Sequence, residues 1–339
     1  MNLLVTGGCG FIGSNFVHHI LDNYPEYVLV NVDKLTYAGN PLNLSGIEEK
    51  HQGRRYFFEQ ADIADKQSME RIFAHYQVDA VLNFAAESHV DRSIDDPEPF
   101  LHTNVLGTQV LLECARRQKT SRFVQISTDE VYGSLGPEGK FHEQYPLTPN
   151  SPYAASKASA DLMVRAYVQT YALPAIITRC SNNYGPFQFP EKLIPLMYLQ
   201  AKQELPLPVY GDGQNIRDWI YVLDHCRGVD LALHKGRPGT AYNFGGDAEK
   251  TNLQVVECIL KATGKPSSLL RMVKDRPGHD RRYAMDYNLA FQELDWSPLY
   301  SFEQGLTKTL NWYEQNTLWL KQVQSGEYKS FMHKWYKER

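Results

Sequence analysis

The chain has 339 residues, of which 42% are hydrophobic and 22% charged, and a formal net charge of −4 at pH 7. This length allows one large domain or two, and the composition is ordinary for a soluble globular protein. The small negative charge excludes a general attraction to nucleic acid or to an anionic membrane surface, so we expect neither as a partner.

The cysteines and the N-terminal segment indicate a reducing compartment. The cysteines are far apart and form no C-x-x-C pair, so we interpret them as buried thiols rather than disulfides or metal ligands. They are Cys9, Cys114, Cys180, Cys226 and Cys258. The chain starts with strand-like residues and no signal-peptide core, and no apolar run reaches the roughly 18 residues that a membrane span needs. We expect a cytoplasmic protein without a metal site.

The first 21 residues predict a strand, a glycine-rich turn and a helix. Leu3-Leu4-Val5 leads into Thr6-Gly7-Gly8-Cys9-Gly10-Phe11-Ile12-Gly13, and apolar residues then recur at helical spacing. Glycines permit positive φ and close backbone approach, and the helix N-terminus offers free N–H groups to a pyrophosphate. The spacing G-x-x-G-x-x-G differs from the common G-x-G-x-x-G, so this motif needs support from downstream.

That support comes from Asp33, which ends a second buried strand over Tyr27–Val32 and lies twenty residues after Gly13. A dinucleotide fold places a carboxylate there for the adenosine ribose hydroxyls. Because an acid would repel a 2′-phosphate, NAD is favoured over NADP.

Further apolar runs predict strands that alternate with helices. They cover Tyr56–Phe58, Val78–Ala86, Arg122–Ser127 and Ala175–Arg179, with a helix near Asn104–Arg117. This alternation predicts an α/β fold with a doubly wound parallel Rossmann-type sheet, whose ligands bind beyond the carboxyl ends of the strands. Residues 1–180 would form the NAD-binding domain.

From about Ser181 the elements become shorter, and prolines and glycines become frequent. We expect 181–339 to form a smaller, mixed substrate-binding region, with an approximate boundary and elements that can return to the first domain. Short elements are predicted at Lys192–Gln203, Val209-Tyr210, Trp219–Val222, Tyr242–Phe244 and Leu253–Thr263. The aromatic and basic tail, Tyr328–Arg339, is assigned to packing or subunit contact.

The stretch Ser127–Lys157 carries the residues that predict chemistry. Tyr153 and Lys157 are four residues apart, so they share one face of a helix. A nearby cation lowers a phenol's pKa by favouring the phenolate, which lets the tyrosine act as a base towards an alcohol. Together with a dinucleotide sheet this predicts hydride transfer at a carbon that bears oxygen, with Thr128 hydrogen-bonded to the same oxygen.

Asp129 and Glu130 are not needed to oxidise an alcohol, so they indicate a second step. Oxidation to a ketone acidifies the neighbouring C–H; one carboxylate can then remove that proton while a protonated carboxyl donates to a hydroxyl leaving from the next carbon. Adjacent residues in a strand point to opposite faces, so this pair has to lie where the strand has ended. The alternative interpretation is an Asp-Glu pair that caps a turn.

The whole set of motifs resembles the extended short-chain dehydrogenases and, within them, the dTDP-glucose 4,6-dehydratase family. The resemblance covers nearly the whole length, and its most specific part is Thr128-Asp129-Glu130, because related sugar epimerases lack the Asp-Glu pair. It rests on Thr6–Gly13, Asp33–Asn40, Ala85–Asp91, Ser127–Gly133, Tyr153-x-x-x-Lys157, Arg179–Pro186, Pro190–Pro195, Arg217-Asp218-Trp219 and Asp275–Asp280.

The resemblance implies a role for each matching residue. Tyr153 is the base at the C4 hydroxyl with Lys157 tuning it, Asp129 is the acid for the C6 hydroxyl, and Glu130 is the base at C5. The NAD site would comprise Gly7, Gly10, Phe11, Ile12, Gly13, Asp33, Lys34, Leu35, Thr36, Asp62, Ile63, Phe84, Ala85, Ala86, Ser88, Thr103, Tyr153, Lys157 and Asn183. The nucleotide-diphosphate sugar would contact Ser88, Thr128, Asn182, Glu191, Lys192, Leu193, Pro208, Val209, Tyr210, Arg217, Asn252, Arg276 and His279.

The expected activity is therefore conversion of dTDP-glucose to dTDP-4-keto-6-deoxyglucose, through C4 oxidation with NAD+, loss of water across C5–C6 and hydride return to C6. The family also implies a homodimer through the helices near Asn104–Arg117 and Tyr153–Tyr171. Two alternatives stay open: a nucleotide-sugar 4-epimerase, which uses the same Tyr and Lys without elimination, and a non-catalytic NAD-binding regulator. Neither the nucleotide base nor the downstream deoxysugar pathway follows from the sequence.

Overall fold

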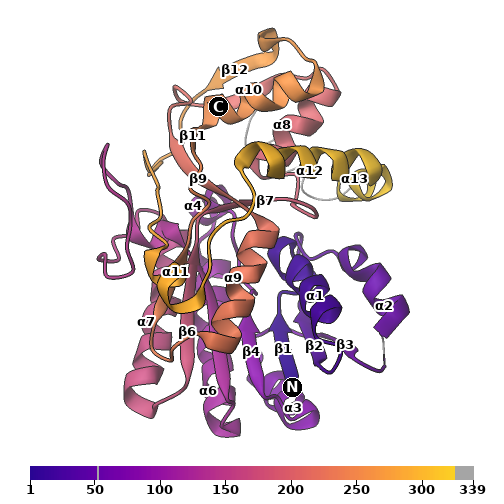
Figure 1. Cartoon of the computed structure of the whole chain (residues 1–339), viewed down its shortest axis with the longest axis vertical. Coiled ribbons are helices and arrows are strands. Elements are labelled where there is room, and N and C mark those ends of the chain that lie inside the picture. The colour runs from indigo at the N-terminus through magenta and orange to yellow at the C-terminus, as the bar shows by residue number, and fades with distance from the viewer. Residues whose placement is uncertain (52, 325–339) are drawn as a thin grey trace.

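The computed structural model describes residues 1–51 and 53–324. In this part of the chain, seven parallel strands form the main sheet in the order β10-β6-β5-β4-β1-β2-β3 (Figure 1). They are β1 (Asn2–Thr6), β2 (Val28–Asp33), β3 (Tyr56–Gln60), β4 (Ala80–Asn83), β5 (Arg122–Thr128), β6 (Ala175–Cys180) and β10 (Ala241–Phe244). The predicted doubly wound α/β class is confirmed, and the strand order reverses between β1 and β4, where such sheets bind ligands.

Helices cover both faces of the sheet. On one face α1 (Phe11–Asn23) and α9 (Val222–Lys235) bury apolar side chains against it, together with α2 (Ser45–His51). On the other face lie α3 (Lys66–Tyr76), α6 (Thr108–Gln118) and α7 (Pro152–Tyr171). The strands read as continuous apolar runs because both of their faces are covered.

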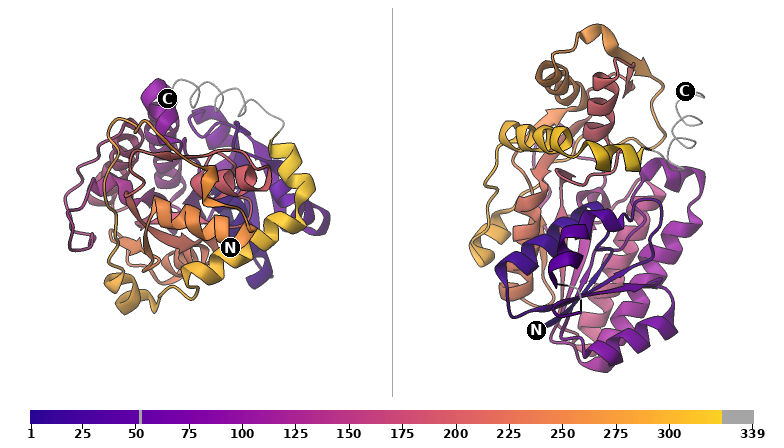
Figure 2. Two further views of the ribbon diagram at one scale, coloured as in Figure 1. Left: turned by 90° about the horizontal axis from the view of Figure 1, so that it is seen from above. Right: turned by 90° about the vertical axis from the view of Figure 1, so that its right-hand side faces the viewer.

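The second half of the chain builds a further core above the carboxyl ends of the strands, where Figure 2 shows α8, α10 and α12 stacked. Its helices are α8 (Leu193–Lys202), α10 (Asn252–Thr263), α12 (Phe302–Gln315) and α13 (Thr317–Val323). Two small sheets accompany them, β11-β9-β7 and β12-β8, made of β7 (Asn182–Tyr184), β8 (Leu207–Tyr210), β9 (Ile216–Tyr221), β11 (Glu249–Thr251) and β12 (Leu270–Val273). Both α10 and α12 begin with a capping box, which fixes their first turns.

The remaining helical elements are short. They are α4 (Val90–Asp95), α5 (Glu98–Phe100), α11 (Asn288–Leu294), η1 (Pro41–Leu44), η2 (Leu101–Gly107), η3 (Asp129–Tyr132) and η4 (Ser267–Leu269). The helix predicted near Asn104–Arg117 is thus divided between η2 and α6.

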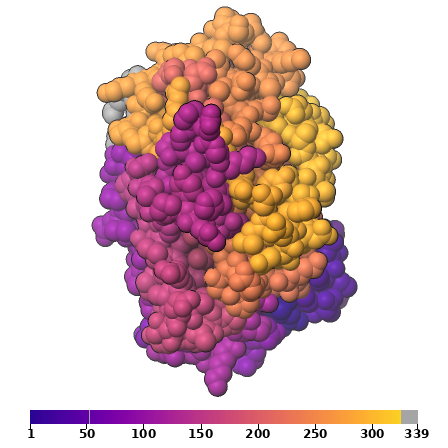
Figure 3. All heavy atoms as spheres, turned by 60° about the vertical axis from the view of Figure 1, so that its left-hand side comes forward, coloured from indigo at the N-terminus to yellow at the C-terminus, as the bar shows by residue number. Residues whose placement is uncertain are grey.

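The two halves interlock rather than follow one another. We placed Tyr242–Phe244 in the smaller region, but these residues lie in β10 and pair in parallel with β6, while α9 packs on the sheet. Figure 3 shows the magenta segment around residues 130–145 lying against the orange later part of the chain, where Phe141 bridges Met285. A boundary near residue 180 stays a prediction.

Four of the five cysteines are buried and Cys258 is partly buried; all have free thiols. Among the described residues no helix is long and apolar enough to cross a membrane, and no group of three His, Cys, Asp or Glu side chains is placed to hold a metal ion. The predicted tail contact, Tyr328–Arg339, lies outside the described residues.

Candidate active site

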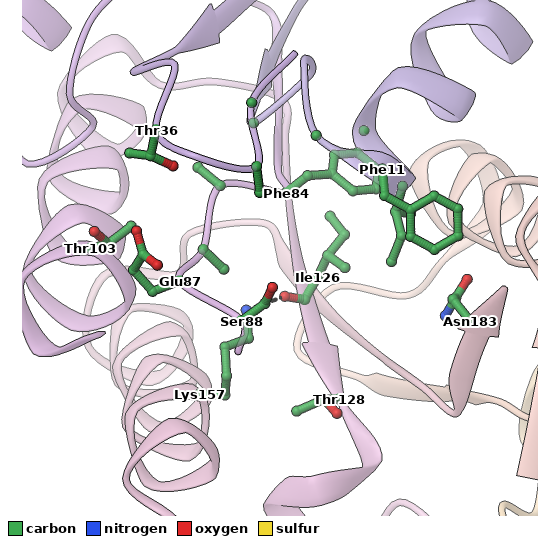
Figure 4. Close-up of a pocket in the computed structure, with 18 of the residues that line it drawn as sticks. Phe11, Thr36, Phe84, Glu87, Ser88, Thr103, Ile126, Thr128, Lys157 and Asn183 are labelled. Atoms are coloured by element: carbon green, nitrogen blue, oxygen red, sulfur yellow. Dashed lines mark hydrogen bonds between the residues drawn. The ribbon is translucent and has the colours of Figure 1, made fainter. Parts of the chain in front are cut away.

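One cavity runs along the carboxyl ends of β1, β2, β4, β5 and β6, from the glycine turn to α7 (Figure 4). Phe11 and Thr36 lie toward one end of the close-up, and Thr128 and Lys157 toward the other. Most of the predicted site residues line this cavity. They are Gly7, Gly10, Phe11, Ile12, Gly13, Asp33, Lys34, Thr36, Asp62, Ile63, Phe84, Ala85, Ala86, Ser88, Thr103, Thr128, Asp129, Glu130, Tyr153, Lys157, Asn182, Asn183, Glu191 and Lys192.

The glycine turn brings backbone unusually close together. A Cβ on Gly13 would lie 2.2 Å from the Gly7 carbonyl oxygen, and one on Gly7, whose φ is +69°, would lie 2.6 Å from the Ala85 nitrogen. Side chains are therefore excluded at both positions, and α1 starts with its N-terminus at the cavity. This is the arrangement that admits a pyrophosphate.

Asp33 organises the neighbouring loop. Its carboxylate accepts hydrogen bonds from the backbone nitrogens of Cys9, at 2.9 Å, and Leu35, at 2.8 Å. Burial raises the pKa of Asp33, although both bonds oppose that shift. Each carboxylate oxygen retains a second lone pair, so Asp33 can also accept from a ribose hydroxyl.

Helix α7 carries Tyr153 and Lys157 to the other end. Ser151 caps the helix by accepting from the Ala154 nitrogen at 3.1 Å, and Pro152 occupies its first position. The Lys157 ammonium donates to the Ile126 carbonyl oxygen at 2.6 Å, which fixes the lysine against β5 (Figure 4).

Burial dominates the titration of this pair. It lowers the pKa of Lys157 to about 8, with Asp161 acting in the opposite direction. The pKa of Tyr153 is raised well above its usual value by burial and by the negative charge of Glu130, while a hydrogen bond with Thr128 lowers it. This differs from our expectation of a depressed phenol pKa, because in the protein without ligands desolvation outweighs the effect of any cation.

Asp129 and Glu130 lie just beyond the end of β5, in the short helix η3, as the elimination chemistry requires. Thr128 caps η3: its hydroxyl accepts from the Glu130 nitrogen at 3.3 Å and donates to Asp129 Oδ1 at 3.1 Å. The helical turn replaces strand alternation, so both carboxyl groups line the same cavity.

The two carboxyl groups have different electrostatic surroundings. Burial and the charge of Glu130 raise the pKa of Asp129 well above its usual value. Burial also raises the pKa of Glu130, but three cations oppose the shift, namely Arg276, Arg217 and Lys192. The pKa of Asp129 is therefore raised further than that of Glu130, which suits Asp129 to be the acid and Glu130 the base.

The nine remaining predicted residues do not line the cavity. Arg217 and Arg276 nevertheless approach closely enough for their charge to act on Glu130. Arg276 lies 3.4 Å from Asp91, which also accepts from the Tyr210 hydroxyl at 2.9 Å, and the His279 ring packs edge-on against Tyr210. The side chains of Leu35, Leu193 and Val209 pack into apolar cores, and Pro208 and Asn252 lie on β8 and at the start of α10.

Several residues of the cavity wall were not predicted. Ser127 and Cys180 lie at the carboxyl ends of β5 and β6 and Ser181 follows β6, so strand position could have indicated them, whereas Glu87 and Phe189 carry no such signal. The full set is Val32, Ala38, Gly39, Ala61, Glu87, Ile126, Ser127, Cys180, Ser181 and Phe189.

The residues present fit a dinucleotide together with a second polar ligand. The glycine turn and Asp33 suit a pyrophosphate and a ribose. Five buried polar atoms of the cavity have no hydrogen-bond partner within the described residues: Ser127 Oγ, Asp129 Oδ2, Ser181 Oγ, Asn182 Oδ1 and Glu191 Oε2. Buried polar groups are normally paired, so these atoms indicate bound molecules.

Comparison with known proteins agrees with this site. A family model described as GDP-mannose 4,6 dehydratase matches residues 4–309. A dTDP-glucose 4,6-dehydratase of Salmonella typhimurium is 49% identical over 365 aligned positions, which cover 100% of both chains. The chain belongs to the dTDP-glucose 4,6-dehydratase family.

Solved structures separate this family from the epimerases. The dTDP-glucose 4,6-dehydratase DesIV of Streptomyces venezuelae, crystallised with NAD and TYD bound, is 47% identical with a TM-score of 0.92, over 95% of this chain and 100% of that one. A UDP-glucose 4-epimerase of Thermotoga maritima has a TM-score of 0.87 over 94% and 100%, but 30% identity. The dehydratases and epimerases share the fold, and the dehydratase is nearer in sequence.

Proposed function

We propose that this chain converts dTDP-glucose to dTDP-4-keto-6-deoxyglucose as a hydro-lyase with NAD as its cofactor. The observation that carries the proposal is the placement of Asp129 and Glu130 in the same cavity as Tyr153 and Lys157, with the pKa of Asp129 raised further than that of Glu130. Tyrosine and lysine suffice for oxidation, whereas loss of water also needs an acid and a base.

Tyr153 acts first, as the base that receives the proton of the C4 hydroxyl. Thr128 hydrogen-bonds to Tyr153 and would do so to the same oxygen. Lys157, one helical turn from Tyr153 and hydrogen-bonded to the Ile126 carbonyl oxygen, would supply the positive charge that stabilises the phenolate. When bound, NAD+ would accept the C4 hydrogen as hydride and would later return it to C6. It would be held by the glycine turn, Asp33 and the other predicted residues on that side of the cavity.

Glu130 and Asp129 act next, on the sugar whose C4 is now a ketone. The C5 proton is acidic beside the ketone, and Glu130 removes it. Asp129 gives its proton to the C6 hydroxyl, which leaves as water, and Glu130 returns a proton to C5 when C6 receives the hydride. The charges of Arg276, Arg217 and Lys192 oppose the rise in the pKa of Glu130 that burial causes, and the same positive charge suits a diphosphate.

We further propose that the enzyme acts in the cytoplasm as a homodimer. Exposed apolar side chains support a subunit contact through η2 and α7: Leu101, Leu106, Leu162 and Tyr171 are 45–55% exposed. The free thiols are consistent with a reducing compartment. A two-part division of the chain near residue 180, with the sugar nucleotide bound mainly by the later part, belongs to the same proposal.

The two alternatives are weaker for specific reasons. A 4-epimerase would need no acid and base at C5 and C6. A regulator without activity would need neither the Asp129 and Glu130 pair nor the Tyr153 and Lys157 pair.

An assay of purified protein with dTDP-, UDP-, CDP- and GDP-glucose side by side tests the proposal. We expect a 4-keto-6-deoxy sugar from dTDP-glucose, at a higher kcat/KM than from the other three. A 4-epimer as the product, or no turnover of any of the four, would contradict it.

A further inference from the structure

A cluster of aromatic and charged side chains crosses the wall of the cavity, apart from the catalytic pairs. The Tyr37 cluster, as we name it, consists of Tyr37, Arg92 and Glu191, with Phe189 beside it. Tyr37 follows β2 in the chain, Arg92 belongs to α4, and Glu191 directly precedes Lys192, the N-cap of α8. Three segments distant in sequence therefore meet there.

The members of the Tyr37 cluster hold one another in place. The Tyr37 hydroxyl donates to Glu191 Oε1 at 3.1 Å. The Arg92 guanidinium lies 3.7 Å from the centre of the Tyr37 ring, and its Nε is 3.9 Å from Glu191 Oε2. The Phe189 ring packs edge-on against Tyr37 with 5.8 Å between ring centres. The hydrogen bond and the ion pair constrain the Glu191 carboxyl group, and the two ring contacts hold Tyr37.

Glu191 needs these contacts because its side chain is only 1% exposed. Burial raises its pKa to about 7, opposed by the charges of Lys192 and Arg92 and by the Tyr37 hydrogen bond. Loss of such a hydrogen bond has a larger free-energy penalty for a buried carboxylate than for an exposed one, because water cannot replace the bond.

The Tyr37 cluster also joins the two ends of the cavity. Asp33, Thr36 and Gly39 lie on the Tyr37 loop and line the cavity on the side of the glycine turn. Glu191 and Lys192 line it on the other side, where Lys192 donates to the Ser88 carbonyl oxygen at 2.8 Å and its charge reaches Glu130. Tyr37 is thus part of the segment on the side of the glycine turn, and its hydroxyl contacts Glu191 on the other side.

We propose that Tyr37 is a positioning residue that couples the two ligand sites, so that a nucleoside diphosphate bound beside Glu191 and Lys192 tightens the hold of the Asp33–Gly39 loop on NAD. This inference rests on the proposed function, which places a dinucleotide and a sugar nucleotide in the two parts of the cavity. A ligand in either site orders the shared cluster, and the second ligand then binds at a smaller entropic cost. Such coupling is reciprocal and typically amounts to about 5–150-fold in affinity.

The variant Tyr37→Phe tests the proposal in the holoenzyme. It removes the hydroxyl that reaches Glu191 and keeps a ring beneath Arg92. Tyr76→Phe is a matched control, because the Tyr76 hydroxyl donates to Glu59 at 2.9 Å outside the cavity. The rate of NAD release is measured with and without saturating dTDP, by capture of freed NAD with an excess of an NAD-consuming enzyme.

We expect dTDP to slow NAD release at least about fivefold in the wild type and in Tyr76→Phe, and less than about twofold in Tyr37→Phe. If Tyr37→Phe loses NAD on purification, the Kd of dTDP with and without added NAD gives the same ratio, since the coupling is reciprocal. An unchanged ratio in Tyr37→Phe, or a wild-type ratio of one, would overturn the proposal. Failure to dehydrate dTDP-glucose would overturn the proposed function instead. The ratio of NAD release rates without and with dTDP could still be measured, as long as the protein binds dTDP.

Discussion

Asp129 and Glu130 are adjacent in sequence, yet their surroundings suit them for opposite roles. Both are buried, which disfavours ionisation of each. The charges of Arg276, Arg217 and Lys192 oppose the rise in the pKa of Glu130, whereas the charge of Glu130 raises the pKa of Asp129 further and Arg217 opposes that rise only in part. An acid and a base are thus formed from two residues of one helical turn.

Replacing Glu130 by Gln separates the two chemical steps. We expect Glu130→Gln to oxidise C4 but to lower the elimination rate by about 10²–10⁴-fold, the usual contribution of a general base. Tyr153→Phe serves as the comparison, because it should abolish reduction of the cofactor. Cofactor reduction is followed by absorbance, and exchange at C5 by mass spectrometry in D2O. Elimination at the normal rate in Glu130→Gln would show that another group is the base.

Lys157 predicts how the first step depends on pH. Burial lowers its pKa to about 8, so its ammonium is charged below that pH and loses its proton as the pH rises through it. A neutral Lys157 no longer stabilises the Tyr153 phenolate, and we expect the rate of C4 oxidation to fall above pH about 8. Single-turnover measurements of cofactor reduction across this range check the prediction. If the rate of C4 oxidation keeps rising above pH about 8, a group other than Lys157 stabilises the Tyr153 phenolate.

At the scale of elements, the glycine turn is the part with the least tolerance for change. A Cβ at Gly13 would meet the Gly7 carbonyl oxygen at 2.2 Å, so the turn would have to open. We expect Gly13→Ala to weaken NAD binding at least about tenfold, or about 1.4 kcal/mol. Gly46→Ala in α2 is the control, because a Cβ there meets no atom within 4 Å. Titration of both variants with NAD measures the effect. Equal NAD affinities in Gly13→Ala and Gly46→Ala would show that the glycine turn does not bind NAD.

The strands of the first half were predictable because each contains a short apolar run, and the first helix was predictable because apolar residues recur at helical spacing after the glycine turn. The motifs at strand ends also placed Asp33, Asp129 and Glu130 at one edge of the sheet before any contact was known. A short element at Tyr242–Phe244 was predicted, but its pairing with β6 was not, because about sixty residues separate the two strands and nothing local indicates which strand a short segment joins. Tyr37 was missed for a similar reason: its partners Arg92 and Glu191 are distant in sequence, and nothing local indicates that they meet.

At the scale of the whole molecule, the exposed apolar side chains of η2 and α7 predict an assembly of two subunits. We expect a dimer by light scattering, and a monomer for Leu162→Glu, which places a charge in the proposed contact. Leu318→Glu is a suitable control, because Leu318 is 74% exposed and belongs to α13, outside the proposed contact of η2 and α7. A monomeric wild type would exclude the dimer. A dimer that persists in Leu162→Glu would show that the subunits meet elsewhere.

The account as a whole requires one cavity to oxidise, dehydrate and reduce the same sugar. Turnover of dTDP-glucose in D2O, with the product analysed by NMR, tests this most directly. We predict a 4-keto-6-deoxy product that carries solvent deuterium at C5, because Glu130 exchanges that proton before the C6 carbon is reduced. A product that keeps its 6-hydroxyl and the original hydrogen at C5, as epimerisation at C4 would give, would contradict the account.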